Sequence, residues 1–237
     1  MPGYVVAEDE VESRREEGDT ASVRTAIDGS RGSEVLEQRV VRFAPGRSRP
    51  RRLEGRQEIL YVVSGGGTVQ LGGARHGLEP DAGVFVLAWE EYEIENPGPE
   101  PLVVVSVLAP AELRAERRCI TVRFADREEL RADEKRTFRL LVAEDAGCRD
   151  VTQFVGIVEP CRAPDHSHPY DEVGYIVEGV GIAHVGGRQT AIGPGSCFHL
   201  PPQSVHCIEN TGPGLMRIMG VFHPAGSPRE RSYDAAA

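Results

Sequence analysis

The stretch Glu58-Ile-Leu-Tyr-Val-Val-Ser-Gly65 returns 114 residues later as Glu172-Val-Gly-Tyr-Ile-Val-Glu-Gly179. With the offset held at 114, further glycines, prolines and an Ile-Glu-Asn triplet also align, without a gap over about 60 residues. The aligned prolines include Pro50 and Pro164. Chance matches would be scattered over all residue types, whereas these fall on turn and strand positions. We therefore predict that the chain contains two copies of one domain.

Each copy is predicted to be all-β. Short runs of apolar and β-branched residues are bounded by Gly-Gly, Pro-Gly or Asn-Pro-Gly turns, as in β-strands joined by tight connections. These runs cover residues 59–63, 83–89, 102–108, 174–177 and 215–222. Many short strands at close spacing are typical of a small sandwich or barrel.

The repeat divides the chain into four predicted segments. An N-terminal arm covers residues 1–21, the first copy 22–118, a connection 119–135, and the second copy 136–237. Within the connection, residues 125–135 are the best helix candidate, because they are polar and begin near an aspartate.

The second copy carries a cluster of potential metal ligands in Pro164-Asp-His-Ser-His-Pro-Tyr-Asp-Glu172. Side chains alternate between the two faces of an extended strand, so His166, His168 and Glu172 share one face. His206, on a later predicted strand, is a fourth candidate. Imidazole and carboxylate together suit Fe(II), Mn(II), Ni(II) or Zn(II). These residues therefore predict a metal site.

Two motifs give the chain a family resemblance. From His166 to Gly179 it reads His-x-His, three residues, Glu, six residues, Gly; later come Pro-Gly, Pro-Pro, His206, three residues and Asn210. Together these resemble the two motifs of the cupin superfamily, and because the resemblance covers both repeats, most of the chain is similar to a bicupin.

The resemblance implies two tandem cupin jelly-roll β-barrels with a short helical connection. It also implies that one divalent transition metal ion per chain (Fe, Mn, Ni or Zn) is bound by four ligands in the second barrel, namely His166, His168, Glu172 and His206. Such a site keeps coordination positions open for water, substrate or dioxygen.

The first copy lacks this ligand set. At an offset of 114 the four positions are occupied by Arg52, Glu54, Glu58 and Tyr92. An arginine does not lose its proton to bind a metal. We therefore expect no metal in the first barrel.

A group of arginines precedes Glu58 in the first copy. They form either an anion site or a solvated loop paired with the acidic excess, and the second interpretation is favoured. The residues are Arg47, Arg49, Arg51, Arg52 and Arg56.

Composition narrows the possible partners. The 27 basic and 37 acidic residues give a net charge of −10, which argues against nucleic acid and anionic membrane surfaces. Lys135 is the only lysine and lies in a polar run, so Schiff-base chemistry is disfavoured. Five unpatterned cysteines, no signal peptide and no long apolar segment predict a cytoplasmic protein.

The favoured function is a metal-dependent enzyme, most readily a dioxygenase-type oxidoreductase, acting on a small-molecule substrate. The alternatives are a non-redox isomerase, lyase, decarboxylase or hydrolase (including one similar to ureidoglycine aminohydrolase) and a non-catalytic small-molecule-binding cupin. His199 is a candidate for a residue that orients a ligand or moves a proton, because it lies seven residues before His206. A monomer and a homodimer are both compatible with the sequence.

Overall fold

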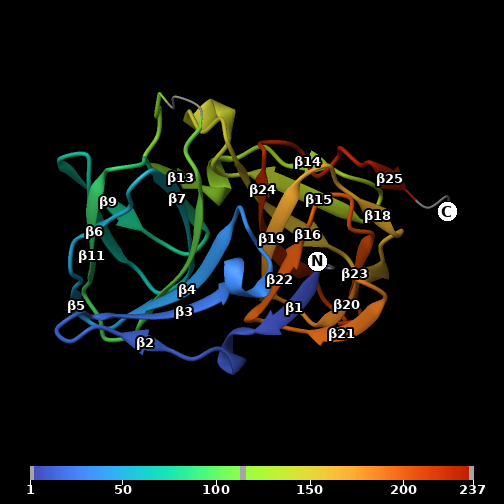
Figure 1. Cartoon of the computed structure of the whole chain (residues 1–237), viewed down its shortest axis with the longest axis horizontal. Helices are drawn as coiled ribbons and strands as arrows, with labels where there is room; N and C mark the ends of the chain where they lie inside the picture. Colours follow the sequence, from blue (N-terminus) through green and yellow to red (C-terminus); the bar gives the residue numbers. More distant parts are fainter. Residues whose placement is uncertain (1–2, 113–115, 235–237) are drawn as a thin grey trace.

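The computed structural model describes residues 3–112 and 116–234. Within these ranges the chain forms 25 β-strands and four single-turn 3₁₀ helices, but no α-helix. The strands build two barrels that lie side by side, each made of antiparallel sheets (Figure 1). The all-β fold and its division into two barrels are thereby confirmed. No helix in this part of the chain is long and apolar enough to cross a membrane.

The first barrel consists of a large and a small sheet. The large sheet has the order β13 (Thr121–Arg123), β10 (Ala82–Val86), β7 (Arg56–Ser64), β12 (Leu102–Pro110), β4 (Glu37–Phe43), β3 (Ala21–Ile27) and β2 (Arg14–Arg15). The small sheet has the order β5 (Gly46–Arg47), β11 (Glu91–Asn96), β8 (Gly67–Leu71) and β9 (Ala74–Leu78), with β6 (Arg51–Arg52) also paired to β11.

The second barrel repeats this arrangement. Its large sheet has the order β1 (Tyr4–Ala7), β22 (Ser196–Leu200), β19 (Asp171–Glu178), β24 (Met216–His223), β16 (Thr152–Val158), β15 (Arg136–Leu140) and β14 (Leu130–Arg131). Its small sheet has the order β21 (Arg188–Ile192), β20 (Gly181–Val185), β23 (His206–Asn210), β18 (His166–Ser167) and β25 (Tyr233–Asp234), with β17 (Cys161–Arg162) also paired to β23.

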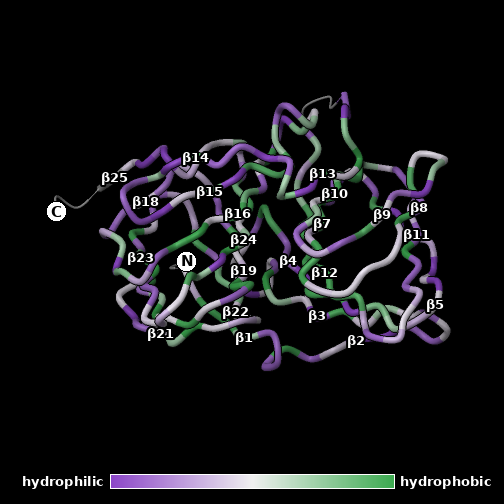
Figure 2. The backbone as a smooth tube through the Cα atoms, turned by 180° about the vertical axis from the view of Figure 1, so that it is seen from behind, coloured by the Kyte–Doolittle hydropathy of each residue, from purple (hydrophilic) through white to green (hydrophobic). Residues whose placement is uncertain are grey.

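The large sheets of the two barrels share a hydrophobic core. In β7, Ile59 and Tyr61 belong to this shared core, whereas Leu60 and Val62 belong to the interior of the first barrel. The alternation explains why β7 is an unbroken apolar run, since both of its faces are buried. Figure 2 shows hydrophobic segments concentrated in this central region. The barrels are thus joined by a buried interface.

Each barrel contains a strand from outside its own copy of the repeat. β1, at the start of the chain, pairs with β22 of the second barrel. β13, in the connection, pairs with β10 of the first barrel. The domain boundaries at 22–118 and 136–237 stay a prediction, but these pairings cross them.

The helix predicted for residues 125–135 is wrong. The segment contains the end of a 3₁₀ turn, η3 (Phe124–Asp126), followed by β14, which extends the large sheet by pairing with β15. Leu130 is its only large apolar residue, so a helix here would have no hydrophobic face to pack. Sheet pairing satisfies the backbone instead.

The register of the small sheets corrects the alignment of the two copies. In the second barrel His166 lies opposite His206. In the first barrel the residue opposite Tyr92 is Arg51. For residues that precede β7, equivalent positions of the two copies are therefore 115 residues apart, because the first copy has one extra residue between β6 and β7. The match of the two prolines at an offset of 114 does not reflect structural equivalence.

A backbone contact supports the same shift. The amide of Gln203 donates to the carbonyl of His168 over 2.8 Å. In the first barrel the amide of Trp89 donates to the carbonyl of Leu53 over 2.9 Å. Gln203 and Trp89 both have a positive φ, 65° and 69°. The structural counterparts of His166 and His168 are therefore Arg51 and Leu53, and not Arg52 and Glu54 as the constant offset had indicated.

Candidate metal centre

Three histidines converge inside the second barrel. The pairing of β18 with β23 places His166 beside His206, and His168 follows β18 directly. Their ligand atoms all lie within 4.8 Å of one another. All three side chains are buried, with 5 to 7% of their surface exposed. His166 and His168 therefore lie together as strand parity predicted, with His206 in place of Glu172 as the third member, and this group can hold a metal ion.

Backbone carbonyls fix the orientation of each imidazole. Nδ1 of His166 contacts the carbonyl oxygen of Pro164 at 2.9 Å, and Nδ1 of His206 contacts that of Ser204 at 2.9 Å. Nδ1 of His168 contacts the carbonyl oxygen of Glu230 at 2.5 Å. A carbonyl oxygen only accepts, so each Nδ1 must carry the proton. Each Nε2 then keeps its lone pair and is available to bind a metal ion.

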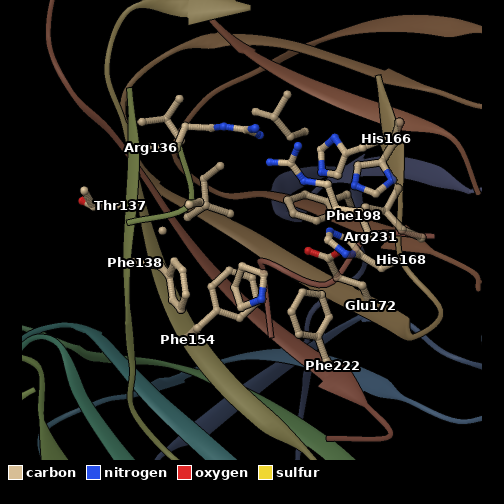
Figure 3. Close-up of a pocket in the computed structure, with 18 residues that line it drawn as sticks. Arg136, Thr137, Phe138, Phe154, His166, His168, Glu172, Phe198, Phe222 and Arg231 are labelled. Carbon is tan, nitrogen blue, oxygen red and sulfur yellow. The ribbon is translucent and has the colours of Figure 1, made fainter. Parts of the chain in front are cut away.

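Glu172 lies in the same pocket but outside the group of three. It projects from β19 toward the pocket that the histidines line (Figure 3). Its side chain is buried, and its Oε2 atom has no hydrogen-bond partner among the described residues. A buried carboxylate oxygen without a partner is costly unless it is protonated or bound to a cation. Its role as a fourth ligand stays a prediction.

The protonation behaviour of the site fits a cation. Burial, followed by the proximity of His206, lowers the pKa of His166 to about 2. Burial also lowers the pKa of His206 to about 4 and lowers that of His168. Burial, with a contribution from Asp171, raises the pKa of Glu172 to about 8. The histidines are therefore neutral ligands at neutral pH, and a bound cation would stabilise the ionised form of Glu172.

The pocket around the site is small and largely apolar. Its volume is about 90 Å³. Phe154 and Phe222 stack with ring centroids 4.8 Å apart, and Phe138 lies nearby on the same wall (Figure 3). Gly220 makes room for this wall, because a Cβ there would lie 2.4 Å from the ring of Phe154. The aromatic rings therefore form an apolar wall on one side of the pocket.

Two arginines that the sequence did not single out also line the pocket. Arg136 begins β15, and its Nε donates to Asp133 over 2.7 Å. Arg231, near the C-terminus, lies 3.8 Å from the same aspartate. One carboxylate thus faces two guanidinium groups. The pairing of β15 with β16 brings Arg136, which follows the polar run around Lys135, to the pocket.

The C-terminal segment covers the histidines. The amide of Ser232 donates to the carbonyl of Ser167 over 2.8 Å, and β25 pairs with β18. The hydroxyl of Tyr170 donates to Glu230, whose carbonyl oxygen orients His168. Nothing in the histidine motif indicates this cover, because the segment is distant in sequence.

His199 lies away from the pocket. Its Nε2 is 2.6 Å from Oδ1 of Asp171, and its ring packs edge-on against Tyr4 of β1. In β19, Asp171 and Glu172 point to opposite faces, so the contact with His199 is on the far side of the sheet from Glu172. His199 is absent from the pocket lining, and a functional role for it stays a prediction.

Comparison with protein families decides the classification. The family model described as a cupin domain matches two regions, residues 39–108 and 155–222, which together make up more than half of the chain. The chain is a member of the cupin family. With one match in each barrel this cupin is a bicupin, as the repeat predicted. No curated protein sequence matches it significantly.

Solved structures with the same fold cover nearly the whole cupin chain. A putative glyoxylate-induced protein from Pseudomonas aeruginosa has a TM-score of 0.80 at 16% identity, with 99% of this chain and 92% of that chain covered. Ylba from E. coli has a TM-score of 0.79 at 12% identity, with coverage of 93% and 90%. A single-residue variant of oxalate decarboxylase from B. subtilis has a TM-score of 0.75 at 13% identity, with coverage of 94% and 78%. At these identities the likeness shows the fold alone.

Proposed function

We propose that this bicupin is a metal-dependent enzyme that converts a small organic molecule in the pocket of the second barrel. The observation that carries the proposal is the group of three buried histidines whose ligand atoms lie within 4.8 Å. A divalent ion held there supplies Lewis acidity and open positions for substrate or dioxygen. Glu172 is the proposed fourth ligand, because its Oε2 has no other partner among the described residues.

The residues of the chain have separate tasks in this proposal. The carbonyls of Pro164, Ser204 and Glu230 hold the imidazoles in the protonation state that leaves Nε2 available. The phenylalanine wall gives the pocket an apolar side, and contact with less water strengthens electrostatic interactions there. Arg136 and Arg231 provide positive charge for an anionic group of the substrate.

The first candidate reaction is a dioxygenase-type oxidation. A mononuclear site with three histidines and one carboxylate suits Fe(II), and an apolar pocket accommodates dioxygen together with an organic substrate. A volume of about 90 Å³ favours a small substrate.

A non-redox reaction on a small carboxylic acid is the second candidate. It is favoured by the two arginines at the pocket and by the fold shared with an oxalate decarboxylase. In this reaction the arginines would hold the carboxylate that stays in place, while the metal site would bind the end of the molecule that reacts.

Metal reconstitution followed by two assays separates these candidates. The protein is stripped of metal and loaded with Fe(II), Mn(II), Ni(II) or Zn(II), and bound metal is measured by elemental analysis. Oxygen uptake is then followed with phenolic and diketone substrates, and CO₂ release with oxalate and other small carboxylates. Oxygen uptake that requires Fe(II) indicates the oxidation, and CO₂ release without oxygen uptake indicates the non-redox reaction. Tight metal binding with neither activity would instead identify a binding protein.

A further inference from the structure

The first barrel contains a cavity of its own, which the metal centre does not use. Its volume is about 250 Å³, larger than that of the pocket at the histidines. At roughly 30 Å³ per water molecule, it has space for about eight waters or a small metabolite. The lining combines a hydrogen-bonded polar cluster, four arginines and apolar walls.

The polar cluster occupies the position of the metal site. The hydroxyl of Tyr92 donates to Oε2 of Glu58 over 2.9 Å, and the hydroxyl of Ser106 donates to Oε1. Glu58 and Tyr92 are the counterparts of Glu172 and His206. All three residues of the cluster are buried and line the cavity. The carboxyl group of the metal site is thus retained, but its partners here are hydroxyl groups that donate hydrogen bonds to it.

The arginines give the cavity an excess of positive charge. Arg51 pairs with Asp19 at 2.5 Å, and Arg49 lies 3.4 Å from Glu16, so two of the four positive charges are balanced within the lining. Arg39 pairs at 2.6 Å with Glu37, which does not line the cavity. Arg52 also lines it, with its guanidinium over the ring of a tryptophan. Glu58 is the third acidic residue of the lining, so four arginines and three acidic residues leave one net positive charge, which suits one singly charged anion.

Arg51 connects the charged and polar parts of the cavity. It stands in the place of the metal-site residue His166, opposite Tyr92 across the sheet. Its Nε is buried without a hydrogen-bond partner among the described residues, and its guanidinium lies over the ring of Phe43. A buried donor of this kind is costly unless a ligand or water accepts from it.

We propose that the first barrel is a second ligand site, selective for a small hydroxycarboxylate. The carboxylate accepts from the Nε of Arg51, which has no partner among the described residues, and from Arg39, while Glu58 and Tyr92 bind the hydroxyl group. Val104 and Leu60 pack against the carbon chain. The site is separate from the metal centre, so this proposal does not depend on the reaction in the second barrel.

Titration calorimetry on the full chain tests the site. The probes are 2-, 3- and 4-hydroxybutyrate, which differ in the spacing of hydroxyl and carboxylate, with butyrate and inorganic phosphate for comparison. We expect at least one hydroxybutyrate to bind roughly tenfold more tightly than butyrate, because a hydrogen bond to a charged or buried group typically contributes that much. Phosphate should bind more weakly than that hydroxybutyrate.

Variants locate the binding. Arg51→Gln should weaken the binding of the hydroxybutyrate and of butyrate alike by roughly tenfold, since it removes the guanidinium donor to which both carboxylates bind. Tyr92→Phe should lower the affinity for the hydroxybutyrate toward that for butyrate, and it should leave the affinity for butyrate unchanged. Arg75→Gln is the matched control, because Arg75 pairs with Glu95 in the same barrel outside the cavity, and it should bind like the wild type. His206→Ala, in the other barrel, should also leave binding unchanged.

Several results would overturn the proposal. They are the absence of binding by all three hydroxybutyrates, tighter binding of phosphate, and binding that survives Arg51→Gln but is lost in Arg231→Gln of the second barrel. If Arg51→Gln does not fold, Val23→Phe replaces it, because Val23 is a half-buried residue of the lining and a larger side chain there reduces the cavity. Undiminished binding in Val23→Phe would equally overturn the proposal.

Discussion

In the first barrel the hydroxyl of Tyr92 donates a 2.9 Å hydrogen bond to Glu58, and in the second barrel the same two positions carry His206 and Glu172. Glu58 also accepts from Ser106, so its two oxygens both have donors within the chain. Oε2 of Glu172 has no such donor among the described residues. One copy of the repeat is thus complete without an ion, whereas the other leaves a buried carboxylate facing three neutral imidazoles.

The metal content should follow from this difference. We expect one ion per chain in the reconstituted protein, and its loss in His166→Ala and in His206→Ala, since each removes one of three converging ligands. Tyr92→Phe should bind the same amount of metal as the wild type. Elemental analysis measures the ion, and circular dichroism checks that the barrels persist. Two ions per wild-type chain would contradict the account of the first barrel.

The pH dependence of stability should report the state of Glu172. In the metal-free protein its pKa is raised to about 8 from 4.5, so the folded form retains a proton that the unfolded form loses. Its contribution is therefore fully present below pH 4.5 and is lost as the pH rises toward 8, with a slope of up to about 1.4 kcal/mol per pH unit.

Glu172→Gln isolates the contribution of Glu172. The histidines titrate in both proteins, so their contribution cancels when the two are compared. Relative to the variant, the wild type should lose stability as the pH rises from 4.5 to 8. The free energies of unfolding are measured by urea denaturation with a chelator present. Metal should restore the wild type at pH 8 and have less effect on the variant. A difference that is independent of pH would show that Glu172 is ionised without metal.

The shape of the pocket should depend on Gly220. A Cβ at this position would lie 2.4 Å from the ring of Phe154, in a part of β24 that is buried. Gly220→Ala should therefore lower the free energy of unfolding by about 1–3 kcal/mol, which is typical of overpacking. Gly214→Ala is the control, because nothing lies within 4 Å of its added Cβ, and it should stay within about 0.5 kcal/mol of wild type. Denaturant unfolding measures both.

Local patterns predicted a large part of this molecule. Strand runs and turn glycines gave the two barrels, because alternation and tight turns are local properties. The parity of His166 and His168 gave their convergence for the same reason. Arg136 and Arg231 were missed, because they reach the pocket only through long-range pairing and the C-terminal cover. The helix expected at 125–135 failed because sheet pairing with β15 outweighed the local preference.

The register of the first barrel offers the sharpest remaining test. The structure makes Arg51 and Leu53 the counterparts of His166 and His168, whereas a constant offset of 114 would select Arg52 and Glu54. Leu53 lines the cavity, whereas Glu54 is exposed and outside it.

We therefore predict that the triple variant Arg51→His, Leu53→His, Tyr92→His acquires a second metal site. Glu58, the counterpart of Glu172, already lines the same cavity as these three positions. The metal content of this variant should rise from one ion to two per chain. The matched variant Arg52→His, Glu54→His, Tyr92→His should stay at one, because its new imidazoles at 52 and 54 are out of register with Glu58. Elemental analysis of both proteins, loaded with the same metal, decides the question. A second ion in the matched variant alone would show that the constant offset of 114 is correct. Arg51 would then not be the counterpart of His166.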